Sequence, residues 1–368
     1  MRAARWFTSA SRPSRVPRTR ARPTFRSRVR RSTSSRCSSA RRAGTSTPTR
    51  RRSSSRRFTT CTCDFSLRGG ASAKVIERLA PAKLNLGLSV LRRREDGYHE
   101  IETIFLPLRL ADRLVVRRGA AGSGIRLAIS GAELPADREN LVHRAAARAC
   151  AELGVRADLE IELEKRVPIA AGLGGGSSDA AATLLALEAL FGQTLGEALR
   201  SRVALSLGAD VPFFLDPRPA LGRGVGERLE TLDGVPEMSW VLVAFPFPIS
   251  TAQAYAEATR ELTLPRVPTS IGALLGPAGL LASPRNDLEA TALRRHPEIR
   301  EAQRALERAG ALATGMTGSG PTVFGRFPND HAAQQAAVRI EVPAGARTIA
   351  TSSPGSASAE SKGNRAGA

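Results

Sequence analysis

Two segments of the chain alternate strictly between hydrophobic and polar residues, the pattern of a β-strand with one buried face. The first spans residues 84–90, with leucine or valine at every even position, and the alternation extends back to Lys83. Lys83 and Asn85 therefore share the polar face of a half-buried strand. The second spans residues 159–164, where leucine or isoleucine alternates with glutamate. We predict a strand in each segment.

Helices are predicted elsewhere. Between Ser177 and about Phe191, hydrophobic residues recur at helical spacing, and Gly192 follows as a stop signal. Residues 298–309 form a second predicted helix, closed by Gly310, and residues 322–325 form a short strand after a glycine-rich turn. Because strands and helices are mixed along the chain, we predict an α+β fold.

The two ends of the chain lack either pattern. Residues 1–72 are mostly Arg, Ser, Thr and Pro, and residues 351–368 are mostly Ser, Gly and Ala. Such segments bury too little surface to offset chain entropy, so we predict a disordered basic leader and a disordered tail. A composition shift near residues 233–236 divides the body into two predicted domains, 73–234 and 235–350.

The net charge of +21 suggests a nucleic-acid binder until its distribution is considered. Residues 1–70 hold 20 Arg and one acidic residue, whereas the rest of the chain holds 35 basic and 33 acidic residues. The nearly neutral body and the two Trp and two Tyr of the whole chain provide no basic aromatic face for nucleic acid. No run of about 18 hydrophobic residues is present. We therefore expect neither a nucleic-acid partner nor a membrane partner.

Two origins fit the leader. Arg- and Ser-rich, acid-poor composition is typical of organelle transit peptides. The same composition arises when GC-rich DNA upstream of the true start is translated. We favour the second origin, because the Ala- and Arg-rich body looks bacterial and the leader has no clear amphipathic helix. This origin predicts a cytoplasmic protein, and the first predicts a plastid protein. Cys150 is the single cysteine of the body, which agrees with a reducing compartment, and we expect a buried, inert thiol.

The strongest local chemical signal is a glycine-rich segment between a predicted strand and a predicted helix. Its glycines let the backbone approach a ligand, and the helix start offers hydroxyls, unpaired N–H groups and a dipole that favour phosphate. No Gly-Lys-Ser/Thr follows, so it is not a Walker A loop, and its spacing does not fit the dinucleotide fingerprint. A plain turn with Ser178 or Asp179 as helix N-cap is the alternative. The predicted phosphate-binding residues are Pro168, Ile169, Ala170, Ala171, Gly172, Leu173, Gly174, Gly175, Gly176, Ser177 and Ser178.

Three further segments accompany this loop: Pro81-Ala-Lys-Leu-Asn-Leu86, Leu207-Gly-Ala-Asp-Val-Pro-Phe-Phe214 and Gly315-Met-Thr-Gly-Ser-Gly-Pro321. In this order, the four segments resemble the GHMP kinase superfamily, named for galactokinase, homoserine, mevalonate and phosphomevalonate kinases. The resemblance covers residues 75–346. It implies a two-domain fold, with an N-terminal domain like ribosomal S5 domain 2 and a ferredoxin-like C-terminal domain. It also implies ATP and Mg²⁺ as cofactors.

Finer details resemble those superfamily members that act on a cytidine diphosphate derivative in the non-mevalonate isoprenoid precursor pathway. These details are Asp-Gly-Tyr-His at residues 96–99, the segments at 81–86 and 207–214, Arg285–Glu289 and Gly222–Glu227. The implied function is ATP-dependent phosphorylation of the 2-hydroxyl of 4-diphosphocytidyl-2-C-methyl-D-erythritol. A kinase of homoserine or of a mevalonate derivative is the alternative within the superfamily. An RNA-binding protein is the alternative from another class.

The resemblance also implies roles for individual residues. Asp210 corresponds to the catalytic base and Lys83 to the catalytic lysine. A carboxylate can accept the proton of an acceptor hydroxyl, and a nearby ammonium keeps that carboxylate ionised and stabilises negative charge. Taken alone, Asp210 is more simply explained as a loop-capping Asp and Lys83 as a strand-surface Lys, and it is their motif contexts that favour the catalytic roles. Ser178 is one candidate ligand of Mg²⁺, whose ligands are otherwise unidentified. The implied substrate-binding residues are Asn85, Tyr98, His99, Thr251 and Tyr255.

Overall fold

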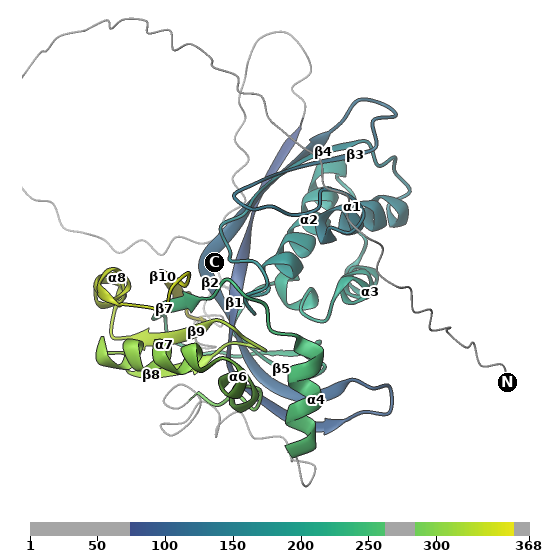
Figure 1. The fold of residues 1–368 in the computed structure, drawn as a ribbon. Coiled ribbons are helices and arrows are strands. Elements are labelled where there is room, and N and C mark those ends of the chain that lie inside the picture. Colours follow the sequence, from purple (N-terminus) through teal and green to yellow (C-terminus); the bar gives the residue numbers. More distant parts are fainter. Residues whose placement is uncertain (1–73, 262–283, 357–368) are drawn as a thin grey trace, which may run out of the picture. The chain divides into compact units, whose positions relative to one another are not determined.

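A long antiparallel hairpin organises the fold (Figure 1). The computed structural model describes residues 74–261 and 284–356, apart from the side chain of the last residue before the gap. Within it, β1 (Val75–Arg93) pairs with β2 (His99–Arg118) over nearly their whole length. The predicted leader, residues 1–72, lies outside the described residues.

The hairpin is the centre of a six-stranded sheet. One edge of β2 pairs with β1, and the other edge pairs with β5 near the start of β2 and with β4 near its end. β3 runs parallel to β4, and β6 pairs antiparallel with β5. The predicted strand at 159–164 is confirmed, with the same bounds as β4. The bounds of the remaining strands are Ile125–Ser130 (β3), Leu159–Glu164 (β4), Ala220–Gly224 (β5) and Arg228–Thr231 (β6).

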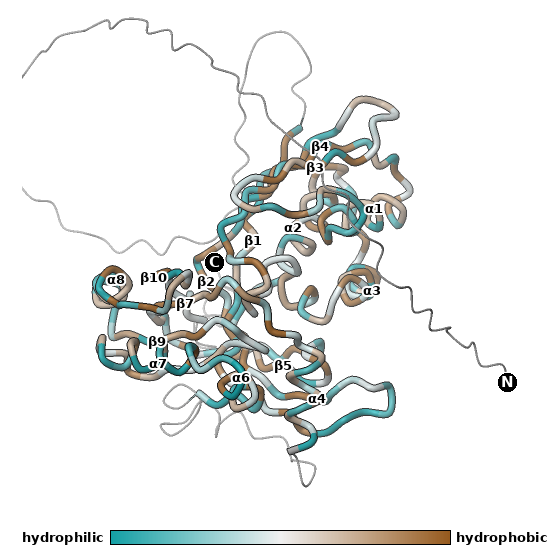
Figure 2. Tube along the Cα trace, in the orientation of Figure 1, coloured by the Kyte–Doolittle hydropathy of each residue, from teal (hydrophilic) through white to brown (hydrophobic). Residues whose placement is uncertain are grey.

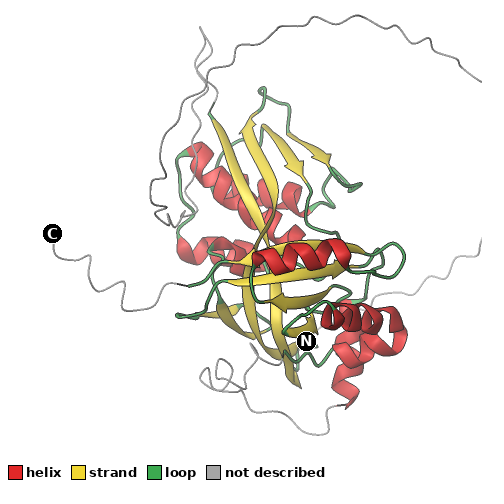
Figure 3. Ribbon diagram, turned by 90° about the vertical axis from the view of Figure 1, so that its left-hand side faces the viewer, coloured by secondary structure: helices red, strands yellow, loops and turns green. Residues whose placement is uncertain are grey.

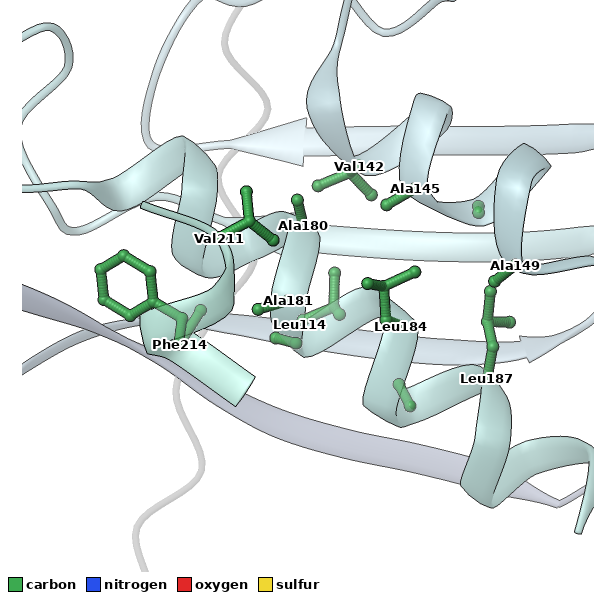
Figure 4. Packing of buried hydrophobic residues seen from close by; sticks show 14 of the residues in the cluster. Leu114, Val142, Ala145, Ala149, Ala180, Ala181, Leu184, Leu187, Val211 and Phe214 are labelled. Atoms are coloured by element: carbon green, nitrogen blue, oxygen red, sulfur yellow. The ribbon is translucent and has the colours of Figure 1, made fainter. Parts of the chain in front are cut away.

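Three helices cover one face of this sheet (Figure 3). They are α1 (Leu141–Glu152), α2 (Gly175–Phe191) and α3 (Glu197–Leu207). The predicted helix ending near Phe191 is confirmed as α2, and Gly192 closes it with the left-handed φ of 67° that favours glycine. Figure 4 shows how these helices bury a hydrophobic cluster against the sheet. Its labelled members are Leu114, Val142, Ala145, Ala149, Ala180, Ala181, Leu184, Leu187, Val211 and Phe214.

A second sheet has four strands in the order β10-β7-β9-β8. The predicted helix at 298–309 corresponds to α7, and the predicted strand at 322–325 overlaps β9. The mixture of helices and sheets confirms the predicted α+β class. The strands are Met238–Ala244 (β7), Ala313–Met316 (β8), Val323–Phe327 (β9) and Arg347–Ser353 (β10). The accompanying helices are Thr251–Glu261 (α4), Glu289–Arg295 (α6), Pro297–Arg308 (α7) and Asp330–Arg339 (α8).

The two sheets share part of their core. Leu84 of β1, Trp240 of β7 and Phe324 of β9 belong to one cluster of buried hydrophobic residues. The predicted domain boundary at residues 234–235 falls in the connection between β6 and β7. Because the cluster spans that boundary, the division into two domains stays a prediction.

The predicted tail at 351–368 is wrong at its start. β10 continues to Ser353, and both Ser352 and Ser353 are buried. The Ser353 hydroxyl accepts a hydrogen bond of 3.0 Å from the indole N–H of Trp240. Polar composition concealed this strand, because serines that find partners inside a sheet need no contact with water. Residues 357–368 lie outside the described residues.

The strand predicted at 84–90 is present as part of β1, but the prediction that it is half-buried is wrong. Lys83 and Asn85 are only 4% and 3% exposed, and the hydrophobic residues between and after them are buried too. One face of β1 packs in the core shared by the sheets, and loops of the candidate site cover the other. Hydrophilic residues concentrate instead at the tip of the β1–β2 hairpin (Figure 2). Alternation predicted the strand, but it carries no information about the covering of the polar face.

Candidate active site

A cavity of about 1120 Å³ gathers most of the residues singled out from the sequence. Its walls come from the β1–β2 hairpin, the glycine-rich loop, the turn after α3, and α4. Segments far apart in the sequence therefore meet at one place. The predicted site residues that line the cavity are Lys83, Asn85, Tyr98, His99, Gly172, Gly174, Ser177, Asp210, Thr251 and Tyr255.

Lys83 and Asp210 form an ion pair in the cavity wall. The Nζ atom of Lys83 lies 3.5 Å from Oδ2 of Asp210. The Lys83 side chain is buried, whereas 32% of the Asp210 side chain is exposed, so a ligand can reach the carboxylate. Asp210 lies on the turn between α3 and a short 3₁₀ helix, η1 (Pro212–Leu215). The arrangement can accept a proton from a hydroxyl and stabilise the negative charge that develops.

Hydrogen bonds hold Lys83 in place. Its ammonium donates to Oδ1 of Asn85 at 2.5 Å, and Nδ2 of Asn85 donates to Oγ1 of Thr103 in β2 at 2.9 Å. The backbone N–H of Lys83 donates to the carbonyl of Leu173 in the glycine-rich loop at 2.9 Å. The β1–β2 register shifts between Pro81 and Lys83, an irregularity of the kind that redirects a side chain. The lysine is therefore fixed to both the sheet and the loop.

The glycine-rich loop leads into the N-terminus of α2. Gly174 is the N-cap, with φ of 72°, and no side chain caps the helix. Neither Ser178 nor Asp179 therefore has the capping role that the sequence left open. The N–H groups of the first turn, with Gly174 and Ser177 in the cavity wall, form a site suited to phosphate.

The rest of the loop lies back from the cavity. Ala171 and Leu173 are buried in the shared hydrophobic cluster, and Ile169 is exposed. Ser178, the candidate Mg²⁺ ligand, is 1% exposed, and its hydroxyl has no hydrogen-bond partner in the described part of the chain. The predicted phosphate-binding residues that do not line the cavity are Pro168, Ile169, Ala170, Ala171, Leu173, Gly175, Gly176 and Ser178.

Two aromatic rings that line the cavity stack on each other. The centroids of His99, at the start of β2, and Tyr255, on α4, are 5.2 Å apart, with 16° between the ring planes. Thr251 lines the cavity from the first turn of the same helix. Tyr98 lines the cavity from the hairpin tip, where it is 64% exposed. His99 is the ring that lies next to Tyr255.

Both stacked rings are uncharged at neutral pH. Burial, followed by the charge of Arg93, lowers the pKa of His99. Burial, followed by the charge of Asp210, raises the pKa of the Tyr255 phenol. The Nε2 atom of His99 is buried and has no hydrogen-bond partner among the described residues. A neutral imidazole has one donor and one acceptor nitrogen, so this atom can meet a polar group of a bound ligand.

Three buried charged residues hold the two ends of the glycine-rich loop. The Lys165 ammonium donates to Oδ2 of Asp112 and, at 2.6 Å, to Oδ2 of Asp179 near the start of α2. Oδ1 of Asp112 accepts from the backbone N–H groups of Arg166 at 2.6 Å and Val167 at 2.8 Å, just before the loop. Sequence analysis missed this cluster because its members lie 53 and 14 residues apart, with no local pattern to connect them.

The charges of this cluster do not balance. Burial raises the pKa of Asp179, and the charge of Asp112 adds to this effect while Lys165 opposes it. Burial alone would lower the pKa of Lys165, but the two carboxylates outweigh burial and raise it. The cluster therefore keeps Lys165 protonated and favours a proton on Asp179.

Three further features of the described residues concern metal binding, membrane spanning and the cysteine. No group of three or more His, Cys, Asp and Glu side chains in residues 74–261 and 284–356 could hold a metal ion. No helix in these ranges is long and apolar enough to cross a membrane. Cys150 is buried, and burial raises the pKa of its thiol to about 11, which confirms the predicted inert thiol.

Comparison with known proteins matches these features to a family of kinases. The family model described as GHMP kinases N terminal domain matches residues 140–216, and the model described as GHMP kinases C terminal matches residues 270–341. A protein of Pelotomaculum thermopropionicum is 46% identical, over 72% of this chain and 93% of its own length. A protein of Syntrophus aciditrophicus is 40% identical, over 73% of this chain and 96% of its own length. Both are named 4-diphosphocytidyl-2-C-methyl-D-erythritol kinase.

Solved structures agree with this match. A crystal structure of 4-(cytidine 5'-diphospho)-2C-methyl-D-erythritol kinase is 41% identical, with a TM-score of 0.66, and covers 76% of this chain and all of its own. A homoserine kinase from Cytophaga hutchinsonii has a TM-score of 0.57 at 21% identity, covering 80% of this chain and 98% of its own. The second likeness shows the fold alone.

Proposed function

The chain belongs to the GHMP kinase family, and from this membership we propose that it uses ATP to phosphorylate the 2-hydroxyl of 4-diphosphocytidyl-2-C-methyl-D-erythritol. One observation carries the proposal beyond the family. A single cavity joins an uncapped helix N-terminus, the Lys83–Asp210 pair and the His99–Tyr255 stack. The helix N-terminus can bind phosphate, the ion pair can take part in proton transfer, and the stacked rings can bind a planar base.

In the proposed reaction the cytosine lies at the His99–Tyr255 end of the cavity. The unpartnered Nε2 of His99 meets the edge of the base, and Tyr98 closes on it from the exposed hairpin tip. The acceptor hydroxyl then points towards Asp210, while the N-terminus of α2 holds the phosphates of ATP. Binding in one cavity aligns the two reactants and removes much of the entropic cost of bringing them together.

The chemical step follows from that alignment. The acceptor oxygen forms a bond to the γ-phosphorus as the bond to the β-phosphate oxygen breaks, and Asp210 takes the hydroxyl proton. Lys83, in its ion pair with Asp210, offsets negative charge on the transferring group. The products are ADP and the 2-phosphate of the substrate.

Mg²⁺ is part of the proposal because phosphoryl transfer from ATP depends on it. Two oxygen ligands in the cavity wall, the Ser177 hydroxyl and the Asp210 carboxylate, suit this cation. Ser178 is less suited, since its side chain is buried. With few carboxylates in the wall, phosphate oxygens and water would complete the shell, as is common for Mg²⁺. When bound, the ion neutralises phosphate charge.

A product analysis tests the proposal. The purified protein, ATP, Mg²⁺ and the cytidine substrate should yield one new phosphomonoester, which ³¹P NMR coupling would place on the 2-oxygen. A phosphate at another position, or ATP hydrolysis without transfer, would overturn it. The proposal includes a cytoplasmic location and the absence of a nucleic-acid partner, which fractionation and a binding assay would test.

A further inference from the structure

Asn286 uses its whole side-chain amide to hold a loop. It lies in the Arg285–Glu289 segment, which has no role in the mechanism above. Its Nδ2 donates to the carbonyls of Met316 at 2.8 Å and Gly318 at 2.7 Å, and its Oδ1 accepts from the backbone N–H of Leu288 at 2.9 Å. Aspartate lacks the two donors, and serine offers only one. This position is therefore specific for an asparagine.

The segment that carries Asn286 is attached to the catalytic strand. The N–H of Leu88 in β1 donates to the carbonyl of Arg285 at 2.8 Å, and the N–H of Asp287 donates back to the carbonyl of Leu88 at 2.9 Å. Oδ2 of Asp287 also accepts from the N–H of Val90 at 2.8 Å. Because Lys83 lies on the same strand, Asn286 has a fixed position relative to it.

The loop that Asn286 holds packs against the site. Oγ1 of Thr317 accepts from the backbone N–H of Asn85 at 2.9 Å. A Cβ atom on Gly318 would lie 3.2 Å from Oδ1 of Asn85 and 3.6 Å from Nζ of Lys83. The Thr317 carbonyl would be 2.7 Å from a Cβ on Gly172, in the glycine-rich loop. The 316–320 loop therefore packs against Lys83, its partner Asn85 and the glycine-rich loop.

We infer that Asn286 is a positioning residue for phosphoryl transfer, which fixes the 316–320 loop against Lys83 and the glycine-rich loop. The inference rests on the proposed function and adds a residue to it. Without the two amide donors, the carbonyls of Met316 and Gly318 lose partners and the loop is free to shift. Displacement by about 1 Å at a supporting contact can cost about 100-fold in rate. The loop also reaches a predicted substrate-binding residue, because the hydroxyls of Ser319 and Thr251 lie 2.9 Å apart.

Steady-state kinetics of Asn286→Asp and Asn286→Ser test this role. Both should lower kcat about 10- to 100-fold, a larger change than that in KM for the cytidine substrate. The matched control is Asn329→Asp. Asn329 is the exposed N-cap of α8, and its side chain only needs to accept from the N–H of Ala332, which a carboxylate also does. The control should keep the wild-type kcat.

Two kinetic results with the single Asn286 variants would overturn the inference. One is a kcat within about twofold of wild type in both Asn286 variants, since misplacement of the lysine must slow the chemical step. The other is a loss of activity that follows the folded fraction, measured by circular dichroism, with kcat per folded molecule unchanged. The double variant with Thr317→Val should be less than additive in kcat, because both side chains hold the same loop. Strict additivity would also contradict the inference.

A binding measurement separates this inference from the proposed function. Titration calorimetry with a non-hydrolysable ATP analogue needs no turnover. Asn286→Asp should bind the analogue about tenfold more weakly than wild type, because the displaced loop packs on Gly172. If the wild type fails to phosphorylate the cytidine substrate, the proposed function is wrong, but the binding measurement still tests the role of Asn286. Equal affinity of wild type and variant for the ATP analogue would then overturn the inference about Asn286.

Discussion

The ammonium of Lys83 and the carboxylate of Asp210 lie 3.5 Å apart, although one residue belongs to a central strand and the other to a turn after a helix. Only the fold brings them together. Asn85 holds the lysine from one side, and the aspartate remains the more exposed partner. This asymmetry suits a base that must reach a substrate and a cation that must stay in place.

Asp210→Asn should nearly abolish turnover while ATP still binds. The amide has the shape of the carboxylate but cannot accept the hydroxyl proton, so kcat should fall about 10²- to 10⁴-fold. Coupled ADP-release kinetics and calorimetric ATP binding measure the two effects. Asp216→Asn is the control, since Asp216 is an exposed partner of Arg218 outside the cavity wall. A kcat of Asp210→Asn above about half of wild type would refute the assignment of the base.

His99→Ala should raise KM for the cytidine substrate far more than KM for ATP. The change removes a hydrogen bond to the base, worth about 1–3 kcal/mol, and the stacking partner of Tyr255. Initial rates with each substrate varied in turn measure the two constants. His331→Ala, on the exposed surface of α8, serves as the control. Equal changes in both KM values would mean that His99 is structural.

Asp179→Asn should change how stability depends on pH. Burial raises the folded-state pKa of Asp179 above its unfolded value, so the folded chain keeps a proton that the unfolded chain releases. Its contribution is therefore present below the unfolded pKa of about 4 and is lost as pH rises through the folded pKa. The free energy of unfolding of wild type should fall, relative to Asp179→Asn, as pH rises from about 5 to 8.

Urea denaturation at several pH values measures this difference. Asp158→Asn is a suitable control, because backbone hydrogen bonds from Gly122 and Gly124 lower the pKa of Asp158. A lowered carboxyl pKa contributes stability above the unfolded value and loses it only in acid, so the control should match the wild-type slope above about pH 5. Parallel curves for wild type and Asp179→Asn would show that Asp179 is ionised throughout.

Sequence reasoning worked where the signal was local. The alternation at 159–164 predicted a strand and Gly192 predicted a helix end, because each depends on neighbours along the chain. It failed where the contacting residues lie far away in the sequence. Nothing around Lys83 reveals that loops cover it, and nothing around Ser353 reveals a buried indole that donates to it. Contacts of this kind depend on tertiary structure, which pattern alone does not contain.

The same distinction applies to the candidate site. Motifs named Lys83 and Asp210, and the structure places them together. The Lys165 cluster and the loop contacts of Asn286 were missed, since their hydrogen bonds join distant segments. Tyr98 lines the cavity from an exposed hairpin tip, and its role in substrate binding stays a prediction. Motif reasoning thus named the groups that the proposed reaction uses and missed the residues that contact them from distant segments.

A chain that begins at Ser72 should match the full chain in kcat and in melting temperature. The described residues that line the cavity lie between Lys83 and Ser319. The composition of the leader predicts a segment that buries no surface, and such a segment adds nothing to catalysis or to stability. Parallel kinetics and differential scanning calorimetry of both proteins provide the comparison. A tenfold loss of kcat, or a melting temperature lower by several degrees, would mean that the leader packs on the folded body.

The central claim is that this cavity selects a cytidine diphosphate substrate for phosphorylation by ATP. The most direct measurement is kcat/KM for ATP-dependent phosphorylation of 4-diphosphocytidyl-2-C-methyl-D-erythritol, homoserine and mevalonate by the same preparation. The cytidine substrate should exceed the other two by at least about 10³-fold, since neither offers a base to His99 and Tyr255. Comparable values for the three compounds, or turnover of homoserine or mevalonate alone, would contradict the account.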